Sequence, residues 1–235
     1  MNPTDPNVQR VELVAAALGE LADDLVLVGG CAVGLLIDSP VAPSPRVTYD
    51  VDLVAEVAAL RHYHALEAQF AQRGFKRDMS PDAPICRWRL GTLEVDLMPT
   101  NERILGFSNR WYGQAVKSST RVMLPSGKAI NLINAPSFLA TKFEAFWTRG
   151  GGDPLMSHDL EDIVNVVEGR QKIEAELAGA QPEVRAYLAA QFVRLLDLPD
   201  FENILPGLLA YDELHAHRVQ VVKRRIRVLA GLLPM

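Results

Sequence analysis

The sequence predicts an α/β (α+β) protein in which a small mixed-sheet core with helices is followed by a mostly helical C-terminal half. Three observations support this fold class. Helical and strand-like patterns alternate in the first part of the chain, no strong strand pattern follows Pro136, and apolar residues beyond that proline recur at helical spacing. We therefore expect two domains, residues 1–135 and 136–235.

In the first part, each expected element follows from its periodicity and from the turn residues beside it. Gly74 closes one helix, three prolines between residues 40 and 45 mark a loop, and Gly91-Thr92 and residues 125–127 are turn candidates between strands. The expected helices are residues 8–21, 31–37 and 60–73, and the expected strands are residues 25–28, 46–57, 85–90, 93–98, 120–124 and 129–133.

In the second part, apolar residues are spaced to bury one face of successive helices. This spacing extends over residues 139–147, 160–167, 184–196 and 208–233. The last of these stretches includes a basic segment, residues 215–227, for which two interpretations stay open. It is either a basic patch for nucleic acid or the solvated face of an amphipathic helix.

Composition favours an ordinary globular protein, with 235 residues, 49% of them hydrophobic, and a formal net charge of −5. This charge argues against broad, charge-driven binding of nucleic acid. No apolar stretch reaches the roughly 18 residues of a membrane span, and the N-terminus lacks a signal-peptide pattern, so we expect a cytoplasmic protein with no membrane partner. The two cysteines have no metal-ligand spacing, and we expect reduced, buried thiols.

Acidic side chains follow a strand pattern at two places. Asp50 and Asp52 alternate with the apolar Val51, so that both carboxylates point to the same face of a strand. Asp96 occupies a similar position in a second short alternating segment. Three acids aligned by neighbouring strands can share two Mg²⁺ ions, whereas the alternative is that these are ordinary solvated strand faces.

Upstream of the first acidic pair, a buried apolar run ends in Gly29-Gly30. Glycines at such a point allow backbone amides to approach an anion closely, although a glycine pair is also common in a simple tight turn. Together with the acids, this pair predicts a site that handles both metal and phosphate.

These signals, in this order, resemble the nucleotidyltransferase superfamily with the DNA polymerase β-like fold, and more closely the AbiEii-type nucleotidyltransferases. The likeness extends over most of residues 25–168, with Gly30-Cys31 standing where a Gly-Ser pair is commoner. The residues that carry it are Gly29-Gly30, the pattern Arg46-x-Thr48-x-Asp50-x-Asp52-Leu53, Asp96, Lys142 in a later helix, and Asp159 in a short acidic motif.

The resemblance implies a role for each of these residues. Asp50, Asp52 and Asp96 would hold the metals, with Asp96 helping to activate the attacking hydroxyl, and Gly29 and Gly30 would contact the triphosphate. Lys142 would neutralise phosphate charge, Asp159 would orient that lysine or a nucleotide group, and Arg46 would hold its loop or touch phosphate. The alternatives are a surface lysine, an acid at a helix start and a surface arginine. Residues 1–135 would then be the catalytic core, and the helical domain would complete the site.

The implied activity is the metal-dependent transfer of a nucleoside monophosphate from a nucleoside triphosphate to a hydroxyl acceptor, with Mg²⁺, two ions in all, as cofactor. Likeness to AbiEii-type proteins favours transfer RNA or another RNA as acceptor, and a toxin restrained by a separate antitoxin protein. Three alternatives remain: a small-molecule nucleotidyltransferase, a non-catalytic nucleotide- or protein-binding module, and a phosphodiesterase or nuclease.

Overall fold

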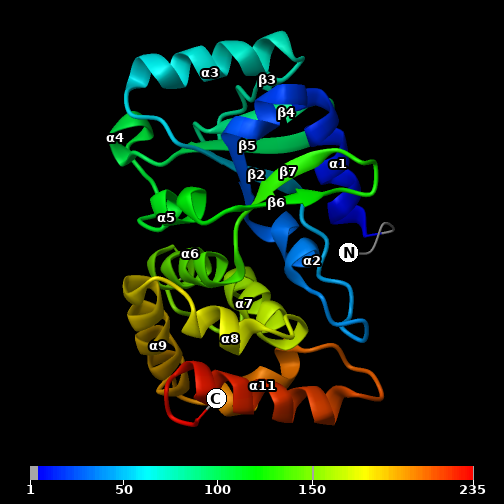
Figure 1. The fold of residues 1–235 in the computed structure, drawn as a ribbon, viewed down its shortest axis with the longest axis vertical. Helices are drawn as coiled ribbons and strands as arrows, with labels where there is room; N and C mark the ends of the chain where they lie inside the picture. The colour runs from blue at the N-terminus through cyan, green and yellow to red at the C-terminus, as the bar shows by residue number, and fades with distance from the viewer. Residues whose placement is uncertain (1–4, 150, 235) are drawn as a thin grey trace. The chain divides into compact units, whose positions relative to one another are not determined.

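The computed structural model describes residues 5–149 and 151–234, and Figure 1 traces their elements. The chain forms two compact units. The first contains the residues up to Leu35 together with Arg46–Asn134, and the second contains Leu36–Pro45 together with the chain from Ala135 onward. The first unit holds a mixed sheet and the second is helical, which confirms the predicted fold class.

Within the described residues, the first unit builds one seven-stranded sheet in the order β3-β4-β5-β2-β1-β7-β6. The pairs β2–β5 and β1–β7 are parallel, and all other neighbours are antiparallel. The strands are β1 (Leu25–Val28), β2 (Asp50–Ala55), β3 (Lys76–Arg77), β4 (Arg87–Leu90), β5 (Leu93–Pro99), β6 (Thr120–Met123) and β7 (Ala129–Leu132).

Helices α1 and α3 of the first unit pack against one face of this sheet. Val51 of β2 is paired with Val95 of β5, and Val95 with Trp88 of β4, so these side chains lie on one face. Helix α1 packs its apolar side against Val51, and the ring of Phe70 on α3 lies 5.7 Å from that of Trp88. The helical elements are α1 (Pro6–Leu18), η1 (Gly19–Asp24), η2 (Gly30–Ala32), α3 (Leu60–Gln72), α4 (Glu102–Leu105) and α5 (Tyr112–Lys117). The acids on the alternate positions of β2 and β5 therefore face away from this core.

Several local features of the first unit differ from expectation, among them the short helices α4 and α5, which were not expected. Strand β2 begins at Asp50 instead of residue 46, because the preceding residues bond to the start of α1: the Thr48 amide donates to Asn7 Oδ1 at 2.9 Å. The expected helix over residues 31–37 is the 3-10 turn η2 followed by the short α2 (Val33–Leu36). Strand β3 was not expected, since two residues carry no periodicity.

The second unit consists of helices and the loop Leu36–Pro45. The backbone amides of Asp38 and Ser39 in this loop donate to the carbonyl of Gly169, and Arg218 donates to the carbonyl of Val41 at 2.8 Å. The helices are α6 (Ala135–Thr148), α7 (His158–Gly169), α8 (Ile173–Ala178), α9 (Pro182–Leu196), α10 (Phe201–Ile204), η3 (Leu205–Leu208) and α11 (His215–Leu229). None of the helices in the described part of the chain is long and apolar enough to cross a membrane.

The basic segment, residues 215–227, lies on α11, which buries Val219, Val222 and Ile226. Its cations pair with acids of the same unit, which reduces the positive charge that the helix offers to a partner. The pairs are Arg218 with Glu168 and Asp212, Lys223 and Arg227 with Glu202, and Arg224 with Glu174.

Candidate metal and phosphate site

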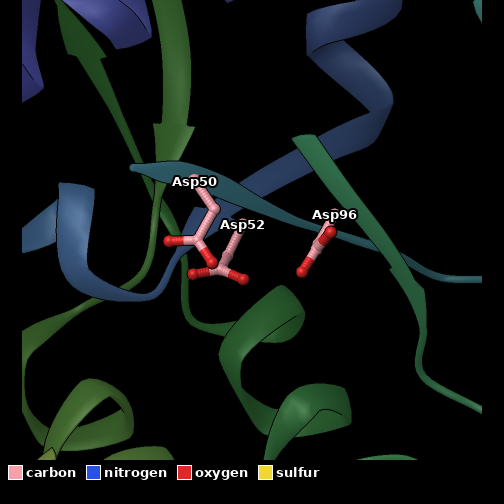
Figure 2. Close-up of side chains that lie close together, drawn as sticks. All are labelled: Asp50, Asp52 and Asp96. Carbon is pink, nitrogen blue, oxygen red and sulfur yellow. The ribbon is translucent and has the colours of Figure 1, made fainter. Parts of the chain in front are cut away.

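The register of β2 and β5 brings the three predicted acids together. These strands are parallel, and Asp52 is directly opposite Asp96, so their side chains share a face with Asp50. One carboxylate oxygen from each residue lies within 4.8 Å of the others. Figure 2 shows the three side chains projecting from the two strands to the same side. The predicted convergence of Asp50, Asp52 and Asp96 is therefore present.

The donor set fits a hard divalent cation such as Mg²⁺ or Mn²⁺, because all three donors are carboxylate oxygens. Asp50 and Asp52 are half-buried and Asp96 is buried, so the cluster is partly open to solvent. Within the described ranges it is the one group of three or more acidic, histidine or cysteine ligands with this proximity. These residues could hold a metal ion.

A further residue, Arg87 on β4, makes direct contact with this cluster. Its Nε and Nη2 atoms donate to the two oxygens of Asp96 at 2.8 and 2.9 Å, and Nη2 also donates to Asp50 Oδ2 at 3.1 Å. Nη1 donates to Glu94 at 2.5 Å. The hydrogen bonds with Asp96 are the main reason that the pKa of Arg87 is raised, so the guanidinium stays charged.

Sequence reasoning missed Arg87, although a signal for it exists. A two-residue turn at Gly91-Thr92 between two expected strands fixes the hairpin register. In the structure this register places Arg87 opposite Asp96 and Arg89 opposite Glu94. Counting outward from the turn would have placed two cations beside the acids.

Gly29 directly follows β1 and Gly30 is the first residue of η2, so the pair lies at the end of β1 that is paired with Asp52. Gly29 has a φ of +68°, and a Cβ atom there would lie 1.8 Å from Asp52 Oδ2. A Cβ on Gly30 would lie 2.4 Å from the Thr48 side chain. Gly29 is thus required by close packing against Asp52 of β2, and Gly30 by close packing against Thr48 in the segment before β2. This is a reason additional to the predicted approach of phosphate.

We expect Gly29→Ala to destabilise the protein by more than the cost of placing alanine at a positive φ. Its Cβ would displace the Asp52 carboxylate, so stability should fall by about 1–3 kcal/mol more than in a control without a clash. Gly91→Ala is the matched control, because Gly91 has a φ of +61° with nothing within 4 Å of its added Cβ. Urea unfolding of the two variants measures the difference, and equal losses of stability would contradict the proposed contact.

Cys31 anchors the chain before β2. Its Sγ lies 2.9 Å from Thr48 Oγ1 and donates to the carbonyl of Asp50 at 3.2 Å. Asn7 completes the anchor by donating from Nδ2 to the carbonyl of Arg46 at 2.8 Å. Arg46 is half-buried, and its guanidinium Nη2 would lie 3.3 Å from a Cβ on Gly30, so it stands beside the glycine pair.

The thiols of Cys31 and Cys86 should react very slowly in the native protein. Both are free and buried, and burial raises the pKa of each to about 12, which leaves almost no thiolate at pH 8. A chromogenic disulfide reagent should find no fast-reacting thiol in the folded protein and two after denaturation. One full equivalent reacting within seconds in the folded state would contradict this burial.

Lys142 and Asp159, both in the second unit, meet in a buried charge cluster. The Lys142 ammonium contacts Asp159 at 2.9 Å and Asp162 at 2.7 Å, and thereby links α6 to α7. Burial alone would lower the pKa of Lys142, but the two carboxylates outweigh it and the pKa is raised. Burial likewise raises the pKa of Asp159, but Lys142 and Arg149 outweigh it and the pKa is lowered. Asp162 and Arg149 were not predicted as members.

Comparison with known proteins gives limited likeness. No protein-family model and no curated protein matches the sequence significantly. Among solved structures, an antigenic nucleotidyltransferase-like protein from Paracoccidioides brasiliensis aligns with 91% of this chain and 98% of its own, at 20% identity and a TM-score of 0.48. JHP933 from Helicobacter pylori aligns with 97% and 93%, at 11% identity and a TM-score of 0.49. At this level neither likeness assigns an activity, and membership of the nucleotidyltransferase superfamily stays a prediction.

Proposed function

We propose that this protein is a metal-dependent nucleotidyltransferase that moves a nucleoside monophosphate from a nucleoside triphosphate to a hydroxyl acceptor. The observation that carries the proposal is the register of β2 and β5, which brings Asp50, Asp52 and Asp96 within 4.8 Å of one another. Three carboxylates repel a triphosphate, so divalent cations must accompany the substrate. Gly29, packed against Asp52, and the adjacent Gly30 give this acidic site backbone amides that a phosphate can approach closely.

In this proposal Asp50 and Asp52 hold the metal, and Asp96, opposite Asp52, accepts the proton of the attacking hydroxyl. When bound, Mg²⁺ neutralises the charge that develops on the attacking and leaving oxygens. Gly29 and Gly30 offer backbone amides to the triphosphate, with Arg46 beside them. The hydroxyl oxygen forms a bond to the α-phosphorus, and the bond to the leaving pyrophosphate breaks.

For Lys142, in the second unit, we propose a structural role in place of direct contact with phosphate. Because the Lys142 ammonium is buried between two carboxylates, its proposed contribution is to fix α6 against α7 and to hold Asp159 in place. Asp159 then serves as the partner that orients the lysine.

We further propose RNA, with transfer RNA as the leading candidate, as acceptor, and a toxin restrained by a separate antitoxin protein as the biological role. The support is the order of the motifs, from Gly29-Gly30 to Asp159, which resembles AbiEii-type proteins. Expression of the wild-type gene from a tightly controlled promoter should then arrest growth, whereas an Asp52→Asn variant at equal protein level should not. Normal growth with the wild type would contradict the toxin role and leave the chemistry standing.

The acceptor can be tested directly. The protein is incubated with each α-labelled nucleoside triphosphate, Mg²⁺ and a small-RNA pool, and the products are separated on a denaturing gel. Label on RNA supports the proposal, and the triphosphate that gives it identifies the transferred nucleotide. Label on a protein or a small molecule would overturn the RNA acceptor, shortened RNA would favour a nuclease, and bound but unreacted nucleotide would favour a binding module.

A further inference from the structure

The guanidinium of Arg87 lies across the predicted metal ligands. It forms a two-pronged contact with both oxygens of Asp96 and reaches Asp50 Oδ2 at 3.1 Å. The Arg87 side chain is only 18% exposed, and its third nitrogen is bonded to Glu94. Arg87 is therefore held in place on three sides by acids, two of which are candidate metal ligands.

A guanidinium and a divalent cation are competing partners for the same carboxylate oxygens. Arg87 supplies a fixed positive charge, since an arginine guanidinium stays protonated over the whole pH range in which proteins are folded. The charge cannot leave by deprotonation. A cation that takes Asp50 as ligand must either displace the arginine arm or bind beside a positive charge.

We propose that Arg87 is an internal counter-ion that competes with the divalent cation and sets the metal affinity of the nucleotide-free protein. The contact with Asp50 is the longest of its four hydrogen bonds to acids and is the one given up when metal enters, while Glu94 keeps the arm against β4. The negative charge of the empty site is thus partly neutralised, and the site is loaded less readily by free metal. This inference rests on the metal site of the proposed function.

The neighbouring arginine on the same strand offers a matched control. Arg89 contacts Asp78 at 2.6 Å and Glu94 at 3.0 Å. Like Arg87 it pairs with Glu94, but its other partner is Asp78, which is not a predicted metal ligand. Arg89→Gln thus removes one cation from β4 and leaves the contacts of Arg87 with Asp50 and Asp96 in place.

The test is a titration of the metal-free, full-length protein with Mn²⁺ and no nucleotide, in which the free Mn²⁺ signal is followed by electron paramagnetic resonance. Arg87→Gln should lower the Kd at least about tenfold, because one positive charge beside the ligands is removed. Arg89→Gln should leave the Kd within about twofold of wild type, since its charge is lost from beside Asp78 and Glu94, which are not predicted metal ligands. An unchanged or higher Kd in Arg87→Gln, or an equal fall in both variants, would overturn the inference.

Thermal melting covers the case in which Arg87→Gln is unstable. In the presence of a metal chelator, the Tm of this variant should be lower than that of the wild type. When Mn²⁺ is added instead, the Tm of the variant should rise by more than the Tm of the wild type. If the variant does not fold in either condition, Arg87→Lys decides, since its ammonium keeps the charge but cannot form the fork. That variant should bind Mn²⁺ more tightly than wild type, and equal or weaker binding would overturn the inference.

The same data separate this inference from the proposed function. Mn²⁺ binding by wild type that is lost in Asp52→Asn but not tightened in Arg87→Gln would contradict only the role of Arg87. Absence of Mn²⁺ binding in both wild type and Arg87→Gln at millimolar concentrations would contradict the metal site itself, and the inference with it.

Discussion

Replacing Asp52 with asparagine should reduce nucleotidyl transfer by about a thousandfold or more, which corresponds to about 4 kcal/mol of lost transition-state stabilisation. Asp52 is opposite Asp96 in the sheet and next to Gly29, so its carboxylate lies at the centre of the proposed site. Asparagine keeps the shape but removes the charge that binds the metal. Stability should change little, because the substitution also relieves repulsion among clustered acids.

The matched control for this variant is Glu56→Gln. Glu56 directly follows β2 and is exposed, and it is not a member of the acidic cluster. Its transfer rate should stay within about twofold of wild type, as is usual for an isolated surface charge. If folded Asp52→Asn keeps wild-type turnover, the assignment of Asp52 as a metal ligand is wrong.

Replacing Lys142 with methionine should lower the free energy of unfolding by about 3–5 kcal/mol, because it leaves buried carboxylates without their main cation. Asp162 is fully buried and Asp159 is 8% exposed, so water cannot substitute for the ammonium. Lys172→Met is the control, since Lys172 is exposed at the start of α8, and chemical denaturation measures both.

The pH dependence gives the Lys142 variant a second signature. In the wild type the pKa of Asp159 is lowered, so its contribution to stability is present above pH about 4 and is lost as the pH falls further. Without Lys142, burial raises that pKa relative to wild type, so the penalty should be smaller at pH 5 than at pH 8. A loss below about 1 kcal/mol, or one that is the same at both pH values, would contradict the buried-cluster account.

The arrangement of the acids could be predicted because strand periodicity is strict. Asp50 and Asp52 alternate with buried residues, and a one-residue error would have placed them in the core. The pairing of β2 with β5 was harder to predict, because parallel neighbours are separated by a long crossover that includes α3. The match of Asp52 with Asp96 depends on that tertiary register.

Other parts of the fold depend on contacts that leave no local pattern. The loop Leu36–Pro45 belongs to the helical unit because its amides and carbonyls bond to Gly169 and Arg218, and a proline-rich loop does not reveal such partners. Asp162 lies buried beside Lys142, a contact that the acidic pattern at the start of α7 does not reveal. A single positive charge in the core determines the position of two acids, and hydrophobic periodicity does not detect it.

The most direct test of the central claim is to measure pyrophosphate release. Wild-type protein and Asp52→Asn are compared with a nucleoside triphosphate, Mg²⁺ and the acceptor pool, and both the triphosphate consumed and the pyrophosphate formed are quantified. The account predicts one pyrophosphate for each triphosphate consumed by the wild type, and a loss of this release in the folded variant. Nucleotide that binds without pyrophosphate release, or release that persists unchanged in Asp52→Asn, would contradict it.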